Sequence, residues 1–226
     1  SGMSADDKYA AAKAAALGFF QAAGYTVENG KITAAPEGAK MQYEVQIPAD
    51  GTGNHPAFMM VTEAKKALAE IGMDIVVTDL SDATALWDGI RARQVDMWCA
   101  AWNATPDPDM YQVYYADVAD FNGDMGNGFN PQGGPDQGNS SYMYCVADEE
   151  LDNMIMEARE SLDQSYRKTL YKACLDTIVD WATEVPVYQR QNAIIFSTER
   201  VKMETVLPDI TTFYGWLNGI ENMELN

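Results

Sequence analysis

The chain has 226 residues, enough for one large domain or two small ones, and its acidic residues outnumber the basic ones by 34 to 15. A net charge of −19 disfavours nucleic-acid binding and adsorption to anionic membranes, because both depend on Lys and Arg side chains. No apolar run has the length of a membrane span, and the three scattered cysteines predict neither a disulfide framework nor a zinc site. We therefore expect no cofactor and no metal.

The first third of the chain predicts a helix, a hairpin and a strand. The helix runs from Asp6 or Asp7 to about Ala23, with apolar residues along one stripe. Residues 25–33 hold an Asn-Gly pair between two β-prone runs, which is typical of a hairpin turn. Residues 41–47 alternate apolar and polar side chains, as a half-buried strand does.

Strands and helices then alternate up to residue 102. Pro56 begins a helix that ends near residue 71, a strand follows at 75–77, and a short helix at 84–93 leads into an apolar run. This order predicts an α/β fold, in which a mixed and mostly parallel sheet is flanked by helices.

The apolar run at residues 96–102 has the character of a strand buried on both faces, so we expect it among the interior strands of the sheet. Pro106 and Pro108 stop the strand, because proline cannot donate to a ladder. Asp107 is predicted to cap the following helix, with Pro108 at its first position and three tyrosines along it.

The turn after this strand is the candidate ligand site. In open α/β sheets, ligands lie beyond the carboxyl ends of the strands, and pockets combine aromatic walls with a few polar groups. The turn concentrates such residues: Trp102, Asn103, Thr105, Asp107 and Tyr111. A turn of this kind is also ordinary α/β architecture, so the pattern alone leaves a structural role open.

The rest of the chain is less regular. Residues 122–141 form a glycine-rich loop that is too long for a simple connector, and Asp148 and Asp163 each cap a helix. Residues 185–188 and 193–196 resemble strands. Residues 198–226 have no sustained period, although they include Phe213, Tyr214, Trp216 and Leu217.

Motifs for catalysis are missing from the sequence. The single histidine, His55, precedes Pro56 in a turn, where a packing or exposed role is more common than catalysis. There is no nucleophile elbow and no phosphate-binding glycine loop. A hydrolase that uses paired carboxylates is the alternative function, and an interaction module that docks through the apolar tail is another.

Five segments, taken in order, resemble the family 5 extracellular solute-binding proteins, the peptide and nickel group that serves ABC transporters. The apolar run followed by Pro-Asp-Pro is similar to that family's "Tyr-Asp-Met…Gly-Trp…Asp-x-x-Asp-Pro" segment, and Val-Pro-Val-Tyr is similar to its exit strand. The matching ranges are residues 6–25, 41–79, 96–108, 142–158 and 181–188.

Family members are considerably longer, so the resemblance implies a periplasmic-binding-protein-like lobe cut from a two-lobed protein. Residues 1–3 would be an expression scar, residues 4–188 the C-terminal ligand-binding lobe, and residues 189–226 a segment that crosses back to the N-terminal lobe. The implied function is that of a non-enzymatic substrate-binding component, which closes over an oligopeptide or similar solute and delivers it to ABC permease subunits. The implied location is extracytoplasmic, as a cell-surface lipoprotein or in the periplasm, with the targeting signal absent from this fragment.

In that cleft, Trp102 and Trp87 would form the apolar wall. Asn103, Thr105 and Asp107 would supply hydrogen bonds, with His55 and Tyr111 at the edge.

One departure from the family concerns charge. Peptide-binding members often place an amine-binding aspartate three residues after the tryptophan, where this chain has Thr105. Either Asp107 substitutes for it through a reshaped turn, or the ligand is not held by a free amine. The family's glycine before the tryptophan is replaced by Ala101.

Overall fold

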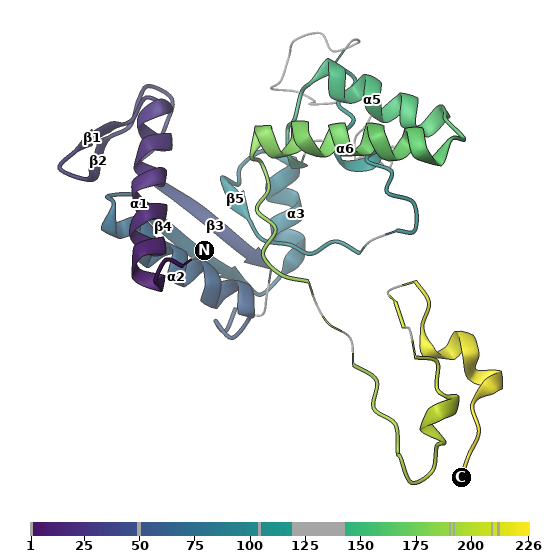
Figure 1. Cartoon of the computed structure of the whole chain (residues 1–226). Helices are drawn as coiled ribbons and strands as arrows, with labels where there is room; N and C mark the ends of the chain where they lie inside the picture. Colours follow the sequence, from purple (N-terminus) through teal and green to yellow (C-terminus); the bar gives the residue numbers. More distant parts are fainter. Residues whose placement is uncertain are drawn as a thin grey trace. The chain divides into compact units, whose positions relative to one another are not determined.

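The computed structural model describes residues 2–48, 51–103, 105–118, 143–189, 191, 193–208, 210–211 and 213–226. It divides into two compact units, Ser1–Ala101 and Trp102–Asn226 (Figure 1). Each unit has apolar clusters of its own.

The first unit opens with the helix and hairpin that the sequence predicts. Helix α1, Ala5–Ala22, begins where the Ser4 hydroxyl accepts a hydrogen bond from the amide of Asp7. Strands β1, Thr26–Glu28, and β2, Lys31–Ala34, pair antiparallel. The turn residues Asn29 and Gly30 have φ of 51° and 73°, as the expected turn requires.

A parallel sheet with helices against it forms the rest of this unit, which confirms the predicted α/β class. Strands β3, Gln42–Pro48, β4, Asp74–Leu80, and β5, Met97–Trp98, lie in the order β4-β3-β5. Helices α2, Pro56–Glu70, and α3, Ala83–Arg91, connect them (Figure 1). The core consists of buried side chains from β3, β4 and α2: Val45, Ile47, Ala57, Val61 and Ile75.

The prediction of an interior strand at residues 96–102 is wrong. Among the described strands β3 is the central one, and β5 pairs with it over only two residues. One further bond, from the Cys99 amide to the Gln46 carbonyl at 2.9 Å, extends the contact, after which Ala100 and Ala101 are exposed. An apolar run predicts burial of side chains, here Trp98 against Trp87, but it does not fix how long a ladder becomes.

Gly72 joins the hairpin to the end of α2. Its φ is +92°, and a methyl group at this position would overlap the carbonyl oxygen of Ile32. The amide of Ile32 donates to the carbonyl of Ile71 at 2.7 Å, so the two backbones are in direct contact. Only glycine permits both the left-handed conformation and this close approach.

The second unit is built on two long helices that lie side by side (Figure 1). Helix α5, Glu149–Glu160, begins after Asp148, and α6, Gln164–Trp181, begins after Asp163. Both predicted caps are confirmed, since Asp148 accepts from the Leu151 amide and Asp163 from the Ser165 amide. The core between the helices consists of Val146, Leu151, Ile155, Cys174 and Ile178. No described helix is long and apolar enough to cross a membrane.

The predicted cap at Asp107 is wrong. Helix α4 is only Tyr111–Tyr114, and the carboxylate of Asp109 accepts from the Tyr111 amide at 3.0 Å. Asp107 instead pairs with Arg167, whose Nη2 contacts both carboxylate oxygens, so this carboxylate is engaged away from the helix start.

The two strand predictions late in the chain are also wrong. The described residues of 185–188 and 193–196 have no regular secondary structure and join no ladder, and Val185 and Ile195 are 80% and 94% exposed. A β-prone sequence forms a strand only where a neighbouring edge offers hydrogen bonds.

The tail beyond these segments folds on itself. An antiparallel bridge joins Val201 to Leu225, and Lys202 forms an ion pair with Glu224 at 2.5 Å. Short helices η4, Met203–Thr205, and η5, Trp216–Asn222, lie between them. The glycine-rich loop predicted at 122–141 lies outside the described residues.

Candidate functional site

Trp102 offers a fixed aromatic surface at the start of the second unit. Its indole Nε1 donates to the hydroxyl of Tyr144 at 2.8 Å, which fixes the orientation of the ring. The side chain is nevertheless 47% exposed. A rigid and half-open indole is suited to stack against an apolar part of a ligand.

Two stacked tyrosines support the tryptophan. Tyr144 stacks on Tyr114 with ring centroids 5.4 Å apart, and the Tyr114 hydroxyl donates to Glu184 Oε2 at 2.6 Å. We call Trp102, Tyr114, Tyr144 and Glu184 the Trp102 cluster. Burial raises the pKa of Tyr144 to about 12, where the Trp102 N–H opposes the rise and Glu184 adds to it. Burial and then Glu184 also raise the pKa of Tyr114, so both hydroxyls stay protonated at neutral pH.

The turn that follows Trp102 is held by Arg167 of α6. The Thr105 hydroxyl donates to the Asp107 carbonyl at 2.7 Å, and Arg167 Nη2 lies 2.9 and 2.8 Å from the two Asp107 carboxylate oxygens. Arg167 Nε also donates to the Ala158 carbonyl, and its side chain is only 15% exposed. The Asp107 carboxylate is therefore already neutralised by a base of the protein.

A second arginine neutralises Asp109. Arg159 Nε lies 3.2 Å from Asp109 Oδ2, and its guanidinium lies over the Tyr111 ring, 4.0 Å from the centroid. Tyr111 also stacks on Tyr115, with centroids 4.6 Å apart. Tyr111 is thus a packed part of this turn, with its ring engaged by a cation and by a second tyrosine.

Asp152 fixes the segment that follows α4. Asp152 is only 6% exposed, and its two carboxylate oxygens accept from the amides of Ala116 and Val118, each at 2.8 Å. Burial raises the pKa of Asp152, while the two amides lower it. This carboxylate therefore replaces the backbone partner that a sheet would otherwise supply.

The structure distributes the predicted site residues over both units. Trp102, Thr105, Asp107 and Tyr111 lie in the second unit as described above, and Asn103 there is exposed. The remaining two, His55 and Trp87, belong to the first unit. A site shared by both sets stays a prediction.

His55 and Trp87 have local structural roles. His55 is the N-cap of α2, where its Nδ1 accepts from the Ala57 amide at 3.2 Å. Trp87 packs edge-on against Trp98, with centroids 6.0 Å apart. These contacts account for both residues without a ligand.

Sequence reasoning missed the residues that organise the second unit around the turn: Tyr144, Arg159, Arg167, Asp152 and Glu184. Asp152 carried one usable signal, because it adjoins Leu151 on the buried side of its helix. The others gave none, since their partners are distant in sequence.

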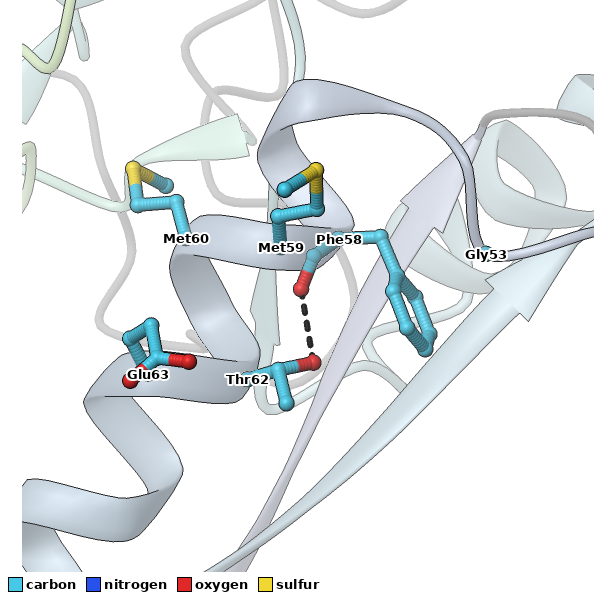
Figure 2. A pocket seen from close by; sticks show the side chains of 6 residues that line it. All are labelled: Gly53, Phe58, Met59, Met60, Thr62 and Glu63. Carbon is cyan, nitrogen blue, oxygen red and sulfur yellow. Dashed lines mark hydrogen bonds between the residues drawn. The ribbon is translucent and has the colours of Figure 1, made fainter.

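An open hollow of about 330 Å³ lies beside the first turns of α2 in the first unit. Figure 2 shows the side chains that line it, with the Thr62 hydroxyl donating to the Phe58 carbonyl at 2.7 Å. Its lining is mostly apolar: Gly53, Phe58, Met59, Met60, Thr62 and Glu63. None of the predicted site residues lines it. Within the described ranges, no group of three or more His, Cys, Asp or Glu could hold a metal ion.

Comparison with known proteins gives matches in structure alone, since no family model and no curated protein matches the sequence. The oligopeptide-binding protein AppA from Bacillus subtilis, solved with a nonapeptide, aligns with a TM-score of 0.56 at 15% identity, over 75% of this chain and 30% of AppA. NikZ from Campylobacter jejuni, solved with Ni(L-His), gives a TM-score of 0.54 at 20% identity, over 76% and 30%. A nickel ABC transporter structure from Bacillus halodurans gives 0.50 at 18% identity, over 76% and 31%.

The chain thus spans about 30% of the length of these proteins. At these identities the likeness establishes the fold, and it agrees with the resemblance that the sequence segments carry. Over about three quarters of its length, the chain shares the fold of a part of these peptide-binding and nickel-transporter proteins.

Proposed function

We propose that this chain is the C-terminal, ligand-binding lobe of the solute-binding component of an ABC importer. It binds an oligopeptide or similar solute against the lobe that precedes it and delivers the solute to the permease outside the cytoplasm. The shared fold and the coverage of about 30% of each neighbour support this proposal. So does the order of the five segments that resemble the family.

The observation that carries the proposal is the state of Trp102. Trp102 is 47% exposed and yet held by its hydrogen bond to Tyr144, so a large part of the ring is open to a ligand in the turn that follows β5. Fixing the ring beforehand lowers the entropy lost on binding, which is how aromatic anchors come to dominate affinity. Asn103 and Thr105, beside it in the turn, are the proposed hydrogen-bonding partners.

Closure of two lobes is the proposed mechanism. A cleft between lobes buries most of a ligand's surface, so one lobe alone leaves one side in water and binds weakly. Residues 189–226 are proposed to contact the other lobe. The exposure of the apolar side chains of Ile195, Phe213 and Leu217 supports this, because such side chains usually have a covering surface.

Mass spectrometry of solute that copurifies with the whole protein tests the proposal. We expect a peptide or similar solute on the unmodified protein and its loss in Trp102→Ala. Trp181→Ala is the matched control, because Trp181 is 43% exposed and its indole N–H also donates to a side chain, Asp148, at 3.4 Å. Equal retention of solute by both variants would contradict the assignment of Trp102, and turnover of the solute would favour the hydrolase.

A further inference from the structure

The hydrogen bond that holds Trp102 depends on the direction of the Tyr144 hydroxyl. An indole N–H can only donate, whereas a phenol hydroxyl can donate its own proton and accept another. The bond of 2.8 Å from Trp102 Nε1 therefore requires that the Tyr144 proton is directed elsewhere, so that an oxygen lone pair faces the indole. A second acceptor is needed to take that proton.

Glu184 is that acceptor. Its Oε2 accepts from the Tyr114 hydroxyl at 2.6 Å, which is a short charge-assisted bond. Burial raises the pKa of Tyr144, the Trp102 N–H lowers it, and the charge of Glu184 and a hydrogen bond to Glu184 raise it again. Because an ionised carboxylate accepts and never donates, both tyrosine protons turn toward Glu184, and a lone pair of Tyr144 is left for Trp102.

The two rings that connect Trp102 with Glu184 are packed in place. Tyr114 and Tyr144 are partly buried against the core of the second unit, and they stack with their planes 17° apart. Trp102 and Glu184 are the exposed members of the Trp102 cluster. Glu184 follows Ala182, the C-cap residue of α6, so the cluster joins the candidate turn to the segment that leaves this helix.

We propose that Glu184 is a positioning residue for solute binding, which holds the Trp102 indole through the hydroxyls of Tyr114 and Tyr144 and does not itself touch the solute. This inference rests on the proposed function and adds to it a dependence of affinity on the segment after α6. That segment leads to residues 189–226. Because coupling between two sites is reciprocal, a solute stacked on Trp102 stabilises the ordered segment in turn.

Hydrogen exchange of the Trp102 indole N–H tests the positioning in the 226-residue chain without any solute. Heteronuclear NMR resolves the indole signals, and Trp102→Phe identifies the one that belongs to Trp102. Glu184→Leu removes the acceptor and is expected to accelerate this exchange about 3- to 10-fold, as the loss of one net hydrogen bond would. Glu199→Leu, the same change at another exposed glutamate, should leave the exchange unchanged.

Three further variants separate the acceptor from the charge and from the fold. Glu184→Gln keeps an oxygen that accepts from Tyr114, so it should restore most of the protection. Tyr114→Phe keeps the ring and the carboxylate but breaks the bond between them, and it should accelerate the exchange in the same direction. Tyr144→Phe removes the acceptor of the indole proton itself and sets the largest acceleration to be expected. Thermal melting checks that each variant folds.

Binding of tri-alanine connects the position of the ring to the solute. Calorimetry and saturation-transfer NMR measure the affinity of the same chains for this peptide. We expect Glu184→Leu to weaken binding about 3- to 10-fold and Trp102→Ala to weaken it at least as much. Glu199→Leu should bind as the unmodified chain does.

Unchanged indole exchange in both Glu184→Leu and Tyr114→Phe overturns the inference. Faster exchange with unchanged tri-alanine binding also overturns it, and if Trp102→Ala binds less tightly, the solute-binding role of Trp102 stands. Absence of tri-alanine binding, or binding that does not depend on Trp102, contradicts the proposed function and with it the role of Glu184 in binding. This last failure is distinguishable from the others because the exchange is measured without peptide.

Discussion

The two units support their backbones in different ways. In the first unit, β3 and β4 pair in parallel along their whole lengths, from Gln42 with Asp74 to Pro48 with Leu80. In the second unit, the segment around α4 joins no sheet, and the carboxylates of Asp109 and Asp152 accept from its amides. A segment without a ladder can therefore be fixed by a few acidic side chains that accept from its amides in place of a neighbouring strand.

Truncation of a buried core side chain is expected to have the largest effect on stability. Making one such truncation in each unit tests whether the two units are equally well packed. Ile47 in the first unit and Ile155 in the second are 1% and 0% exposed. Truncation of either to alanine is expected to lower the free energy of unfolding by about 2–5 kcal/mol, because it leaves a cavity. Urea denaturation measures this, with Ile195→Ala as a control at 94% exposure. An Ile155→Ala variant as stable as the control would show that α5 and α6 do not share a packed core.

Removing the Asp152 carboxylate tests directly whether an acidic side chain holds the segment around α4 as a ladder holds β3 and β4. Asp152→Ala leaves the amides of Ala116 and Val118 without their acceptor, which is expected to cost about 1–3 kcal/mol of stability. Asp176→Ala, an exposed acid on α6, should cost far less. Hydrogen exchange at residues 116 and 118 should accelerate only in the first variant. Unchanged exchange there would mean that something other than Asp152 holds the segment.

Trp102 should separate binding from stability. Trp102→Ala in the whole protein is expected to weaken solute binding by roughly 1–3 kcal/mol and to change stability less, since the ring is half exposed. Calorimetry with the copurified solute and thermal melting measure the two effects. A stability loss of about 3–5 kcal/mol would instead identify Trp102 as a core residue.

The pH dependence of Asp152 should give the smallest effect. Burial raises its pKa above the ordinary 3.8, so the folded protein holds this proton more tightly than the unfolded chain does. Its stabilising contribution is complete below that ordinary value and declines as the pH rises through the folded pKa. The stability of the unmodified chain relative to Asp152→Asn should therefore fall with rising pH in urea titrations. A difference that rises with pH would contradict burial as the dominant cause.

The sequence predicted the elements that depend on neighbouring residues. The Asn29-Gly30 turn, the helix start at Pro56 and the caps at Asp148 and Asp163 each need only a few consecutive residues, and all are confirmed. The α/β class followed from the same local periods.

Partners that are far apart in the sequence could not be predicted. Arg167 lies 60 residues from Asp107, and Glu184 lies 70 residues from Tyr114, so no spacing rule connects them. For the same reason the candidate turn was identified, whereas the tyrosines and charges around it were not. The position of β5 at the end of the described sheet depended likewise on which strand lies beside it.

The contact at Gly72 couples the movement of the hairpin to that of the end of α2. Where two backbones touch directly, no side chain lies between them that could change rotamer and absorb a displacement. A displacement of β1 and β2 is therefore expected to move the backbone between α2 and β4, through the contact of Ile32 with Ile71. A spin label on the hairpin would consequently report the motion of this backbone, and through β4 the motion of the sheet, even though the hairpin contributes no strand to that sheet.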